Sequence, residues 1–388
     1  MSYYDFNLLF TPGPTNVPYR VLEAGSRPML HHRTAEFSKI VENSIYKMKE
    51  VFGTKEDVLM VHTTGRGAME GALKNLFQPG EEILSICNGK FGEMFADIGE
   101  TIGLKVTRTC TNWLEPIQLE VIEKELEANA HIRGVTITHC DTSTGVANPI
   151  EQIGEVVRKH GRLLIVDCVS SLGCMEFKFD EWRVDVALTA SQKGLMSPTG
   201  ISFVAINERA WDVIEKSNSN GYYINFKEIK KEFGRLETPG STPTSLAASV
   251  NESLNMIFEE GLENVLKRHE TISIAIKECM PAIGLELFPK GLTNRSHSLT
   301  VLKVPEGISS EQIVTMAKEY YGIQIAGGLG KYKDTTIRIG HMGYIREREA
   351  LLIIAALEDI MHRLGYTESM GRALKIFNGL LTRVKVRG

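Results

Sequence analysis

The sequence lacks several features that mark whole classes of protein. No apolar run approaches the roughly 20 residues that a membrane-spanning helix needs. The start, MSYYDFNLLFTPGPT, has neither the basic region nor the long apolar stretch of a signal peptide, and the end, VKVRG, is not a peroxisomal address. The 6 cysteines form no C-x-x-C pair, which argues against a disulfide framework and a zinc cluster. We therefore expect a cytoplasmic protein with reduced thiols.

An excess of charge of one sign is also missing. The formal net charge is -4, so there is no electrostatic reason to expect nucleic acid or an anionic membrane as a partner. Only the end of the chain carries charges of a single sign, because no acidic residue follows Met370. We expect residues 369–388 to form a basic helical tail on the surface. With 43% hydrophobic and 24% charged residues, the chain should fold completely and act on a small molecule.

Short apolar runs alternate with helix-like stretches through the first half of the chain. Strands are predicted at 58–61, 82–86, 105–109, 134–138, 163–167, 186–190 and 201–205. Helices are predicted at 36–52, 68–77 and 150–159. This alternation predicts an α/β fold with a mainly parallel sheet that is covered by helices.

The pattern changes from about residue 246 to long amphipathic helices, followed by strands at 298–304 and 335–340. This indicates a smaller, second α+β domain, and 388 residues are too many for one ordinary core. The predicted divisions are an N-terminal arm with a substrate loop, a large domain, a small domain and the tail. Their ranges are 1–20, 21–250, 251–368 and 369–388.

Two residues at strand ends suggest cofactor chemistry, because ligands of open α/β sheets bind beyond the carboxyl ends of the strands. Asp167 ends the run LLIVD, and Lys193 follows the run VALTA within TASQKGLMSPTG. A buried carboxylate keeps the pyridine nitrogen of pyridoxal 5′-phosphate (PLP) protonated, and a desolvated lysine amine forms imines. Alone, Asp167 could equally bind a ribose or a metal or cap a helix, and Lys193 could be a surface charge. Their positions one strand apart strengthen both assignments.

The segment HTTGRGAMEG, residues 62–71, is a glycine-containing turn before a predicted helix. Free N–H groups and the positive end of the helix dipole suit a phosphate there. The candidate contacts are Thr63, Thr64, Gly65 and Arg66. The glycines miss the G-x-G-x-x-G spacing, and the next strand runs into Asn88 rather than an acidic residue, so a nicotinamide dehydrogenase is disfavoured.

Two further side chains could complete a site. Phe91 could stack on an aromatic cofactor, although a core position is the more common fate of a phenylalanine. Arg338 alternates with Ile337 and Ile339 and could bind a substrate carboxylate, although alone it would more often form a structural ion pair. No H-E-x-x-H, Walker A or G-x-S-x-G motif is present, and the 10 histidines show no metal-ligand spacing. No metal is therefore expected.

Eight segments of the sequence occur in an order that is typical of one family. They are PGPTNVP, HHRTAEFSKI, TTGRGAMEGAL, HCDTSTGV, LLIVDCVSSLG, ALTASQKGLMSPTG, STPTS and IRIGHMG. With them the chain resembles the class V, fold-type I aminotransferases over nearly its full length, and specifically the alanine–glyoxylate and serine–glyoxylate (serine–pyruvate) branch. The resemblance implies a homodimeric PLP enzyme. It also implies ping-pong transamination from a small L-amino acid, alanine or serine favoured, to a 2-oxo acid, glyoxylate or pyruvate favoured.

The resemblance also implies a role for each site residue. Lys193 would carry PLP as a Schiff base and move the α-proton, while Asp167 would pair with the pyridine nitrogen. Phe91 would stack on the ring, and Thr142 would lie near its phenolic oxygen. Substrate would contact Arg338, through its carboxylate, and Gly13. The phosphate would be held by Thr64, Gly65, Arg66, Ser191, Gln192 and, across a dimer interface, Thr242.

Three positions depart from the pattern of the relatives. Those proteins often carry tryptophan at Phe91, glutamate at Asp141 and a tyrosine a few residues before Thr242, where this chain has Thr238 and Pro239. The first difference preserves stacking. The other two leave the substrate and the geometry of the interface open, so aspartate, ureidoglycine or an aminosulfonate are alternative donors.

Two other functions are compatible with the same fold, a cysteine desulfurase-like lyase and a non-catalytic binding protein. Cysteine desulfurase-like lyases usually place histidine before the lysine and a reactive cysteine in a mobile loop. Here Gln192 precedes Lys193, and Cys279 lies in a predicted helix end, so the lyase is the weaker alternative. A non-catalytic binding protein would have no need of Lys193, Asp167 and Arg338 together.

Overall fold

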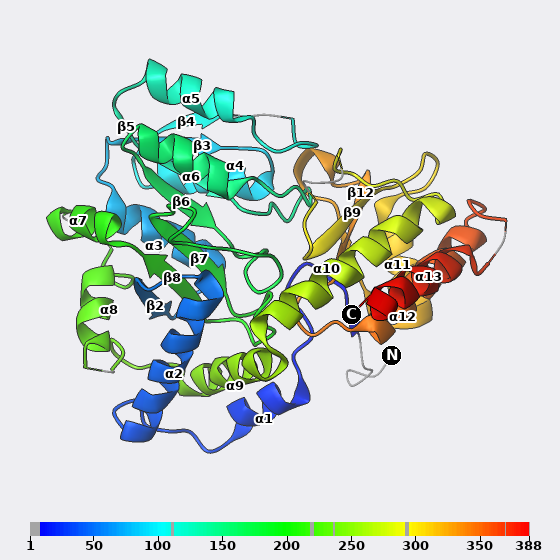
Figure 1. The fold of residues 1–388 in the computed structure, drawn as a ribbon, viewed down its shortest axis with the longest axis horizontal. Coiled ribbons are helices and arrows are strands. Elements are labelled where there is room, and N and C mark those ends of the chain that lie inside the picture. The colour runs from blue at the N-terminus through cyan, green and yellow to red at the C-terminus, as the bar shows by residue number, and fades with distance from the viewer. Residues whose placement is uncertain are drawn as a thin grey trace.

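A seven-stranded sheet forms the centre of the larger part of the molecule (Figure 1). The computed structural model describes residues 8–109, 112–217, 221–235, 237–291, 295–368 and 370–387. The strands are β2 (Asp57–Val61), β3 (Glu82–Ile86), β4 (Lys105–Thr109), β5 (Ile132–Thr138), β6 (Leu163–Asp167), β7 (Val186–Ala190) and β8 (Ser202–Ile206). Their order is β2-β8-β7-β6-β5-β3-β4, and only β8 runs antiparallel to its neighbours. The predicted α/β fold with a mainly parallel sheet is therefore confirmed.

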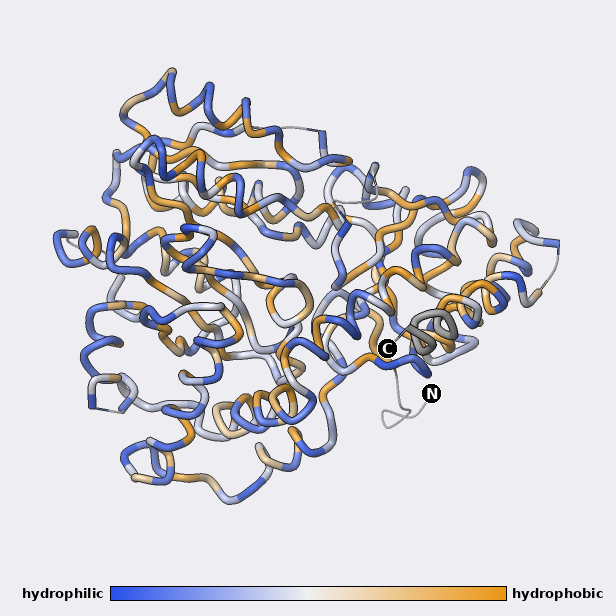
Figure 2. Tube along the Cα trace, in the orientation of Figure 1, coloured by the Kyte–Doolittle hydropathy of each residue, from blue (hydrophilic) through white to orange (hydrophobic). Residues whose placement is uncertain are grey.

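Helices cover both faces of this sheet, which explains why its central strands are apolar without alternation. On one face, side chains from α2 (Ala35–Phe52), α5 (Leu119–Ala128), α6 (Ile150–Lys159) and α9 (Thr244–Glu260) share a core with Leu164 and Val166 of β6. On the other face, α3 (Gly65–Leu76), α4 (Lys90–Thr101), α7 (Glu208–Lys216) and α8 (Phe226–Phe233) pack with Leu163 and Ile165. The hydrophobic strands lie inside a more polar shell of helices (Figure 2).

The predicted helix at 68–77 begins earlier in the structure, at Gly65. The phosphate-type turn thus becomes the first turn of α3 itself. A Cβ at Gly65 would lie 2.8 Å from Cγ2 of Val169, which follows β6, so glycine lets the helix start pack closely against the strand end. Strand β5 also begins two residues before the predicted range, at Ile132.

The C-terminal part of the chain forms a smaller unit with its own core around a small antiparallel sheet. Its strands β9 (Leu299–Lys303), β11 (Ala326–Gly327) and β12 (Thr336–Gly340) lie in the order β11-β12-β9. Helices α10 (Leu262–Cys279), α11 (Ser310–Tyr321) and α12 (Glu347–Arg363) enclose one apolar core with it. The arm strand β1 (Leu8–Leu9) pairs with β10 (Ile323–Gln324), so the start of the described chain contacts this small domain.

Two predicted domain boundaries, at residues 250/251 and 368/369, lie within or close to helices of the structure. The division between residues 250 and 251 falls inside α9, which packs on α1 (Tyr19–Ser26) and α2. Gly261, with φ 87°, separates α9 from α10. The tail is helical from Arg372 as α13 (Arg372–Arg387), and its Ala373 and Phe377 are fully buried in the small-domain core. The first turns of the tail are therefore part of that core.

Two sequence expectations concern thiols and membranes. Among the described residues, Cys87, Cys140, Cys168, Cys174 and Cys279 are buried and no disulfide joins any two of them, while Cys110 lies outside the described residues. Within the described ranges, we find no helix whose length and apolar character would let it cross a membrane.

Candidate active site

The predicted strand-end residues meet in one cavity. Strands β2, β3, β5, β6 and β7 all point the same way, and the segments after them line a cavity of about 340 Å³. Of the residues singled out from the sequence, the lining contains Gly13, Thr64, Gly65, Arg66, Phe91, Thr142, Asp167, Gln192 and Lys193. The parallel sheet thus brings together segments that are far apart in the sequence.

Asp167 and Lys193 lie at the ends of adjacent strands, and burial changes the pKa of both. Burial raises the pKa of Asp167 to about 7, although its Oδ1 accepts a hydrogen bond from the Val169 N–H at 2.8 Å and the Lys193 charge favours the carboxylate. Burial lowers the pKa of Lys193 to about 8, against the opposing charge of Asp167. The amine is therefore much closer to its neutral, nucleophilic form at pH 7 than an ordinary lysine.

The N-terminal loop closes on the lysine. Lys193 Nζ donates a hydrogen bond to the Pro12 carbonyl, and the Thr15 hydroxyl donates to the Lys193 carbonyl at 3.2 Å. Gly13, with φ 120°, lies so close that a Cβ there would overlap the Lys193 side chain. Side chains other than glycine rarely adopt this φ, so the conformation of the predicted substrate loop favours glycine at this position.

The start of α3 offers groups that suit a phosphate. No side chain caps the helix at Thr64, which leaves its first N–H groups for a ligand at the cavity wall. The Gln192 Oε1 atom is buried with no hydrogen-bond partner among the described residues, a costly state that a ligand can relieve because the amide can rotate. Helix start and amide together fit the phosphate of PLP.

Arg338, on β12 of the small domain, does not line the cavity itself but contacts Thr142 in its wall. Its Nε donates to the Gly327 carbonyl at 2.7 Å and its Nη1 to the Thr142 carbonyl at 3.4 Å, so its hydrogen bonds go to neutral groups. Burial lowers the pKa of Arg338 to about 10, an effect that the Asp141 charge opposes. A half-buried guanidinium with such partners is suited to bind the carboxylate of a ligand.

Two predicted phosphate contacts lie elsewhere in this chain. Ser191 is fully buried, and its hydroxyl donates to the Pro198 carbonyl at 2.6 Å. Thr242 is hydrogen-bonded to the Thr238 hydroxyl. Neither residue lines the cavity, so their contact with a phosphate stays a prediction.

The structure also adds residues that the sequence reasoning missed. Ser170 lines the cavity and shares a hydrogen bond with the Thr142 hydroxyl, and Val169 forms part of the same wall. Both follow Asp167 directly, so their place after a strand was an available signal. Met69 and Met94 come from helices on the same cavity and carried no such signal.

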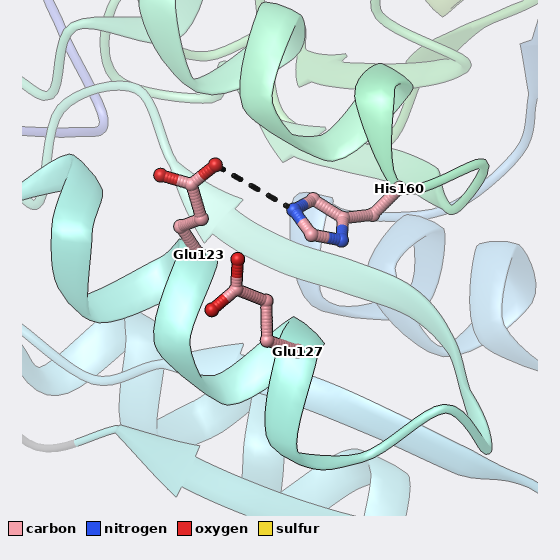
Figure 3. A group of neighbouring side chains, drawn as sticks. All are labelled: Glu123, Glu127 and His160. Atoms are coloured by element: carbon pink, nitrogen blue, oxygen red, sulfur yellow. Dashed lines mark ion pairs between the residues drawn. The ribbon is translucent and has the colours of Figure 1, made fainter.

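One group of side chains could hold a metal ion by distance alone (Figure 3). Glu123 and Glu127 on α5 and His160 at the end of α6 place one ligand atom each within 4.8 Å of one another. Lys159 Nζ, however, donates to Glu123 Oε1 at 2.6 Å, so an ammonium already neutralises this carboxylate. The group shares no residue with the cavity, and we assign it as a surface ion-pair network.

The fold and the cavity together define a class of protein. A buried aspartate and a lysine of lowered pKa at adjacent strand ends, with a helix N-terminus beside them, are the parts of a fold-type I PLP-dependent enzyme. Residues 8–346 match the family Aminotransferase class-V, and the chain belongs to this family of PLP-dependent aminotransferases. The family resemblance read from the sequence is confirmed.

Relatives and solved structures agree with this assignment. The chain is 34% identical to the L-aspartate–glyoxylate aminotransferase of Paracoccus denitrificans, over 94% of this chain and 93% of that protein. It is 33% identical to the serine–glyoxylate aminotransferase of Methylorubrum extorquens, over 91% of this chain and 90% of that protein. The ureidoglycine–glyoxylate aminotransferase of Bacillus subtilis superposes with a TM-score of 0.92 at 29% identity, over 98% of this chain and 99% of that one.

The lowered pKa of Lys193 leads to a pH prediction. Only the neutral amine attacks an aldehyde, so covalent capture of PLP by cofactor-free protein should accelerate as the pH rises and level off above about 8. Capture is measured by borohydride reduction at each pH and by mass spectrometry of the labelled peptide. A rate that keeps rising toward pH 10.5, as for an exposed lysine, or a label on another residue would contradict the assignment.

Proposed function

We propose that this enzyme transfers the amino group of a small L-amino acid, with alanine or serine favoured, to a 2-oxo acid, with glyoxylate or pyruvate favoured. The observation that carries the proposal is that Asp167 and Lys193 line one cavity and that Arg338, from the small sheet, donates to the carbonyl of Thr142 in the wall of that cavity. The relatives described above are named for different donors, but all three names share glyoxylate. A ping-pong scheme follows because one cavity serves donor and acceptor in turn.

The residues of the cavity fit PLP in one orientation. Asp167 would pair with the pyridine nitrogen, Phe91 would face the ring, and the start of α3 with Gln192 would hold the phosphate. Thr142 would lie near the phenolic oxygen. When bound, PLP supplies an electron sink for the bonds at the substrate α-carbon. A cationic ring nitrogen beside Asp167 would favour its ionised form and so offset the effect of burial on its pKa.

Lys193 and Arg338 would act on the substrate. An amine with a pKa near 8 both accepts and returns a proton close to neutral pH, so Lys193 is suited to move the proton at the α-carbon. Arg338 would hold the α-carboxylate and thereby orient the α-carbon toward Lys193. The same arginine would bind the 2-oxo acid in the second half of the reaction, since both substrates carry this carboxylate.

The side chains of the cavity wall bear on the choice of donor, and the cysteine Cys279 bears on the lyase alternative. Met69, Met94 and Val169 give the cavity a partly apolar wall, which favours a small uncharged donor over aspartate or an aminosulfonate. A desulfurase would need a thiolate. Cys279, the cysteine considered for that role, is buried, and burial raises its pKa to about 12, so it is a poor nucleophile.

We further propose that the enzyme is a cytoplasmic homodimer. The surface around α1 and α2 carries large exposed apolar side chains, with Tyr19 81%, Met29 79% and Tyr46 65% exposed. Met29 lines a surface cavity of about 320 Å³, together with residues of α1, α2 and α9. Such apolar exposure is typical of protein interfaces. A second copy docked there would supply its Thr242 to the phosphate of the first.

The central test is the absorption spectrum of the purified enzyme with PLP. A yellow band should bleach on addition of L-alanine or L-serine and return with glyoxylate or pyruvate. Lys193→Ala should remain folded, as judged by circular dichroism, and lose at least about 10³-fold in turnover because the proton carrier is gone. Near-normal transamination by this variant, or no band in wild-type enzyme given PLP, would sink the proposal.

Arg338 provides a test of substrate binding. Arg338→Lys keeps the positive charge but loses the planar fork, so kcat/KM for the amino donor should fall by about 10- to 100-fold. The affinity for PLP should change little. Steady-state kinetics and a PLP titration separate the two effects, and an unchanged kcat/KM would exclude Arg338 from carboxylate binding.

The dimer is tested by size and by cofactor affinity. Analytical ultracentrifugation should give twice the chain mass of 43.2 kDa. Thr242→Ala should remain dimeric and bind PLP about 5-fold more weakly, because one hydroxyl hydrogen bond to the phosphate is lost. A monomeric wild-type enzyme with full activity would rule out the interface.

A further inference from the structure

The carboxylate of Asp141 has no part in the function proposed above, yet it is fully buried beside the cavity. Its Oδ2 accepts from the backbone N–H of Phe91 at 2.9 Å and of Gly92 at 3.1 Å. Its Oδ1 accepts from the backbone N–H of Ser143 at 2.9 Å and from the Ser143 hydroxyl at 2.6 Å. Both oxygens are therefore occupied by hydrogen-bond donors.

These bonds cap helix α4 from a distant part of the chain. The residue before the helix, Gly89, has no side chain that could cap it, and the Ser143 hydroxyl accepts from the Lys90 N–H at 2.9 Å. Asp141 and Ser143 thus bind the first three N–H groups of α4, at the positive end of its dipole. A Cβ at Gly89 would overlap the Asp141 carboxylate, so glycine permits this close approach.

Asp141 is linked in this way to two residues in the wall of the cavity, Phe91 and Thr142. Phe91, fixed through its backbone by Asp141, lines the cavity. Thr142, the next residue, lines it as well, and its carbonyl accepts from Arg338 Nη1 at 3.4 Å. The negative charge of Asp141 also favours the charged form of Arg338. A shift of Asp141 would therefore displace a large-domain aromatic residue and a small-domain arginine together.

We propose that Asp141 is a positioning residue that sets Phe91 against the cofactor ring and Arg338 against the substrate carboxylate. It acts through these two residues and does not itself line the cavity. The proposal rests on the proposed function, since both targets belong to that site.

Replacement by asparagine removes this role with little change in volume. An amide has one acceptor oxygen, whereas the two oxygens of Asp141 face backbone N–H groups on both sides. In Asp141→Asn the amide NH₂ must point at donors on one side, which leaves buried N–H groups without a partner. Phe91 and Thr142 should then shift away from their places in the wall.

Asp185 provides a matched control for the loss of a buried carboxylate. It is 1% exposed and precedes β7, at the opposite end of that strand from Lys193. Its carboxylate accepts from the Leu164 N–H at 2.8 Å, from Asn207 at 2.9 Å and from Arg209 at 2.8 Å. Asp185→Asn should lower the stability of the protein but leave the active site in place.

The experiment measures the dissociation constant of PLP, the visible circular dichroism of the bound cofactor and the KM for the amino donor. Asp141→Asn should weaken PLP binding by about 10-fold, alter the dichroic band and raise the KM by about 10-fold. Asp185→Asn should stay within about twofold of wild type in all three. Ser143→Ala, which removes one acceptor of α4 and one donor to Asp141, should weaken PLP binding by about threefold.

The outcomes distinguish the two proposals. If wild-type enzyme binds no PLP, the proposed function fails and this inference falls with it. If wild type binds PLP and transaminates, but Asp141→Asn matches Asp185→Asn in PLP affinity and KM, only the positioning role is overturned. Should Asp141→Asn not fold, Ser143→Ala decides, because an affinity equal to that of Asp185→Asn would overturn the role.

Discussion

The site depends on one physical constraint, the burial of two opposite charges at the carboxyl edge of a sheet that is covered on both faces. Asp167 is buried and Lys193 is half-buried in the cavity wall, so the charged forms of both are less stable than in solvent, and the pKa of each moves toward neutral pH. Their mutual attraction offsets part of that cost. As a result, the amine of Lys193 is more nucleophilic and the carboxylate of Asp167 is suited to a cationic partner. Both properties follow from the fold.

The remainder of the structure keeps this edge in place. Gly65 allows α3 to begin directly against the strand ends, and Gly13 allows the N-terminal loop to reach Lys193. Arg338 comes from the small domain but donates to the carbonyl of Thr142 in the large one. Asp141 connects that contact to the start of α4. The cavity thus lies close to the contact between Thr142 and Arg338, where small shifts of the backbone would move both residues.

The sequence allowed most of the sheet and the central pair of residues to be predicted. Buried strands were visible as apolar runs, and Asp167 and Lys193 stood at their ends. The start of α3 was placed three residues late because glycines at 65 and 67 discourage a helix assignment, whereas tertiary packing favours them there. Ser191 was predicted from resemblance, yet its hydroxyl is hydrogen-bonded to the carbonyl of Pro198 in its own loop.

The sequence by itself allowed the family and the strands of the large sheet to be predicted and singled out Lys193 and Asp167, because these depend on local pattern and on motif order. Only the tertiary structure decided the order of the strands, the reversal of β8 and the cap that Asp141 places on α4. These features depend on contacts between residues of different elements, such as Phe91 and Asp141, which lie 50 positions apart, and no local periodicity encodes such a contact. The shifted pKa values belong to the same group, since burial exists only in the folded chain.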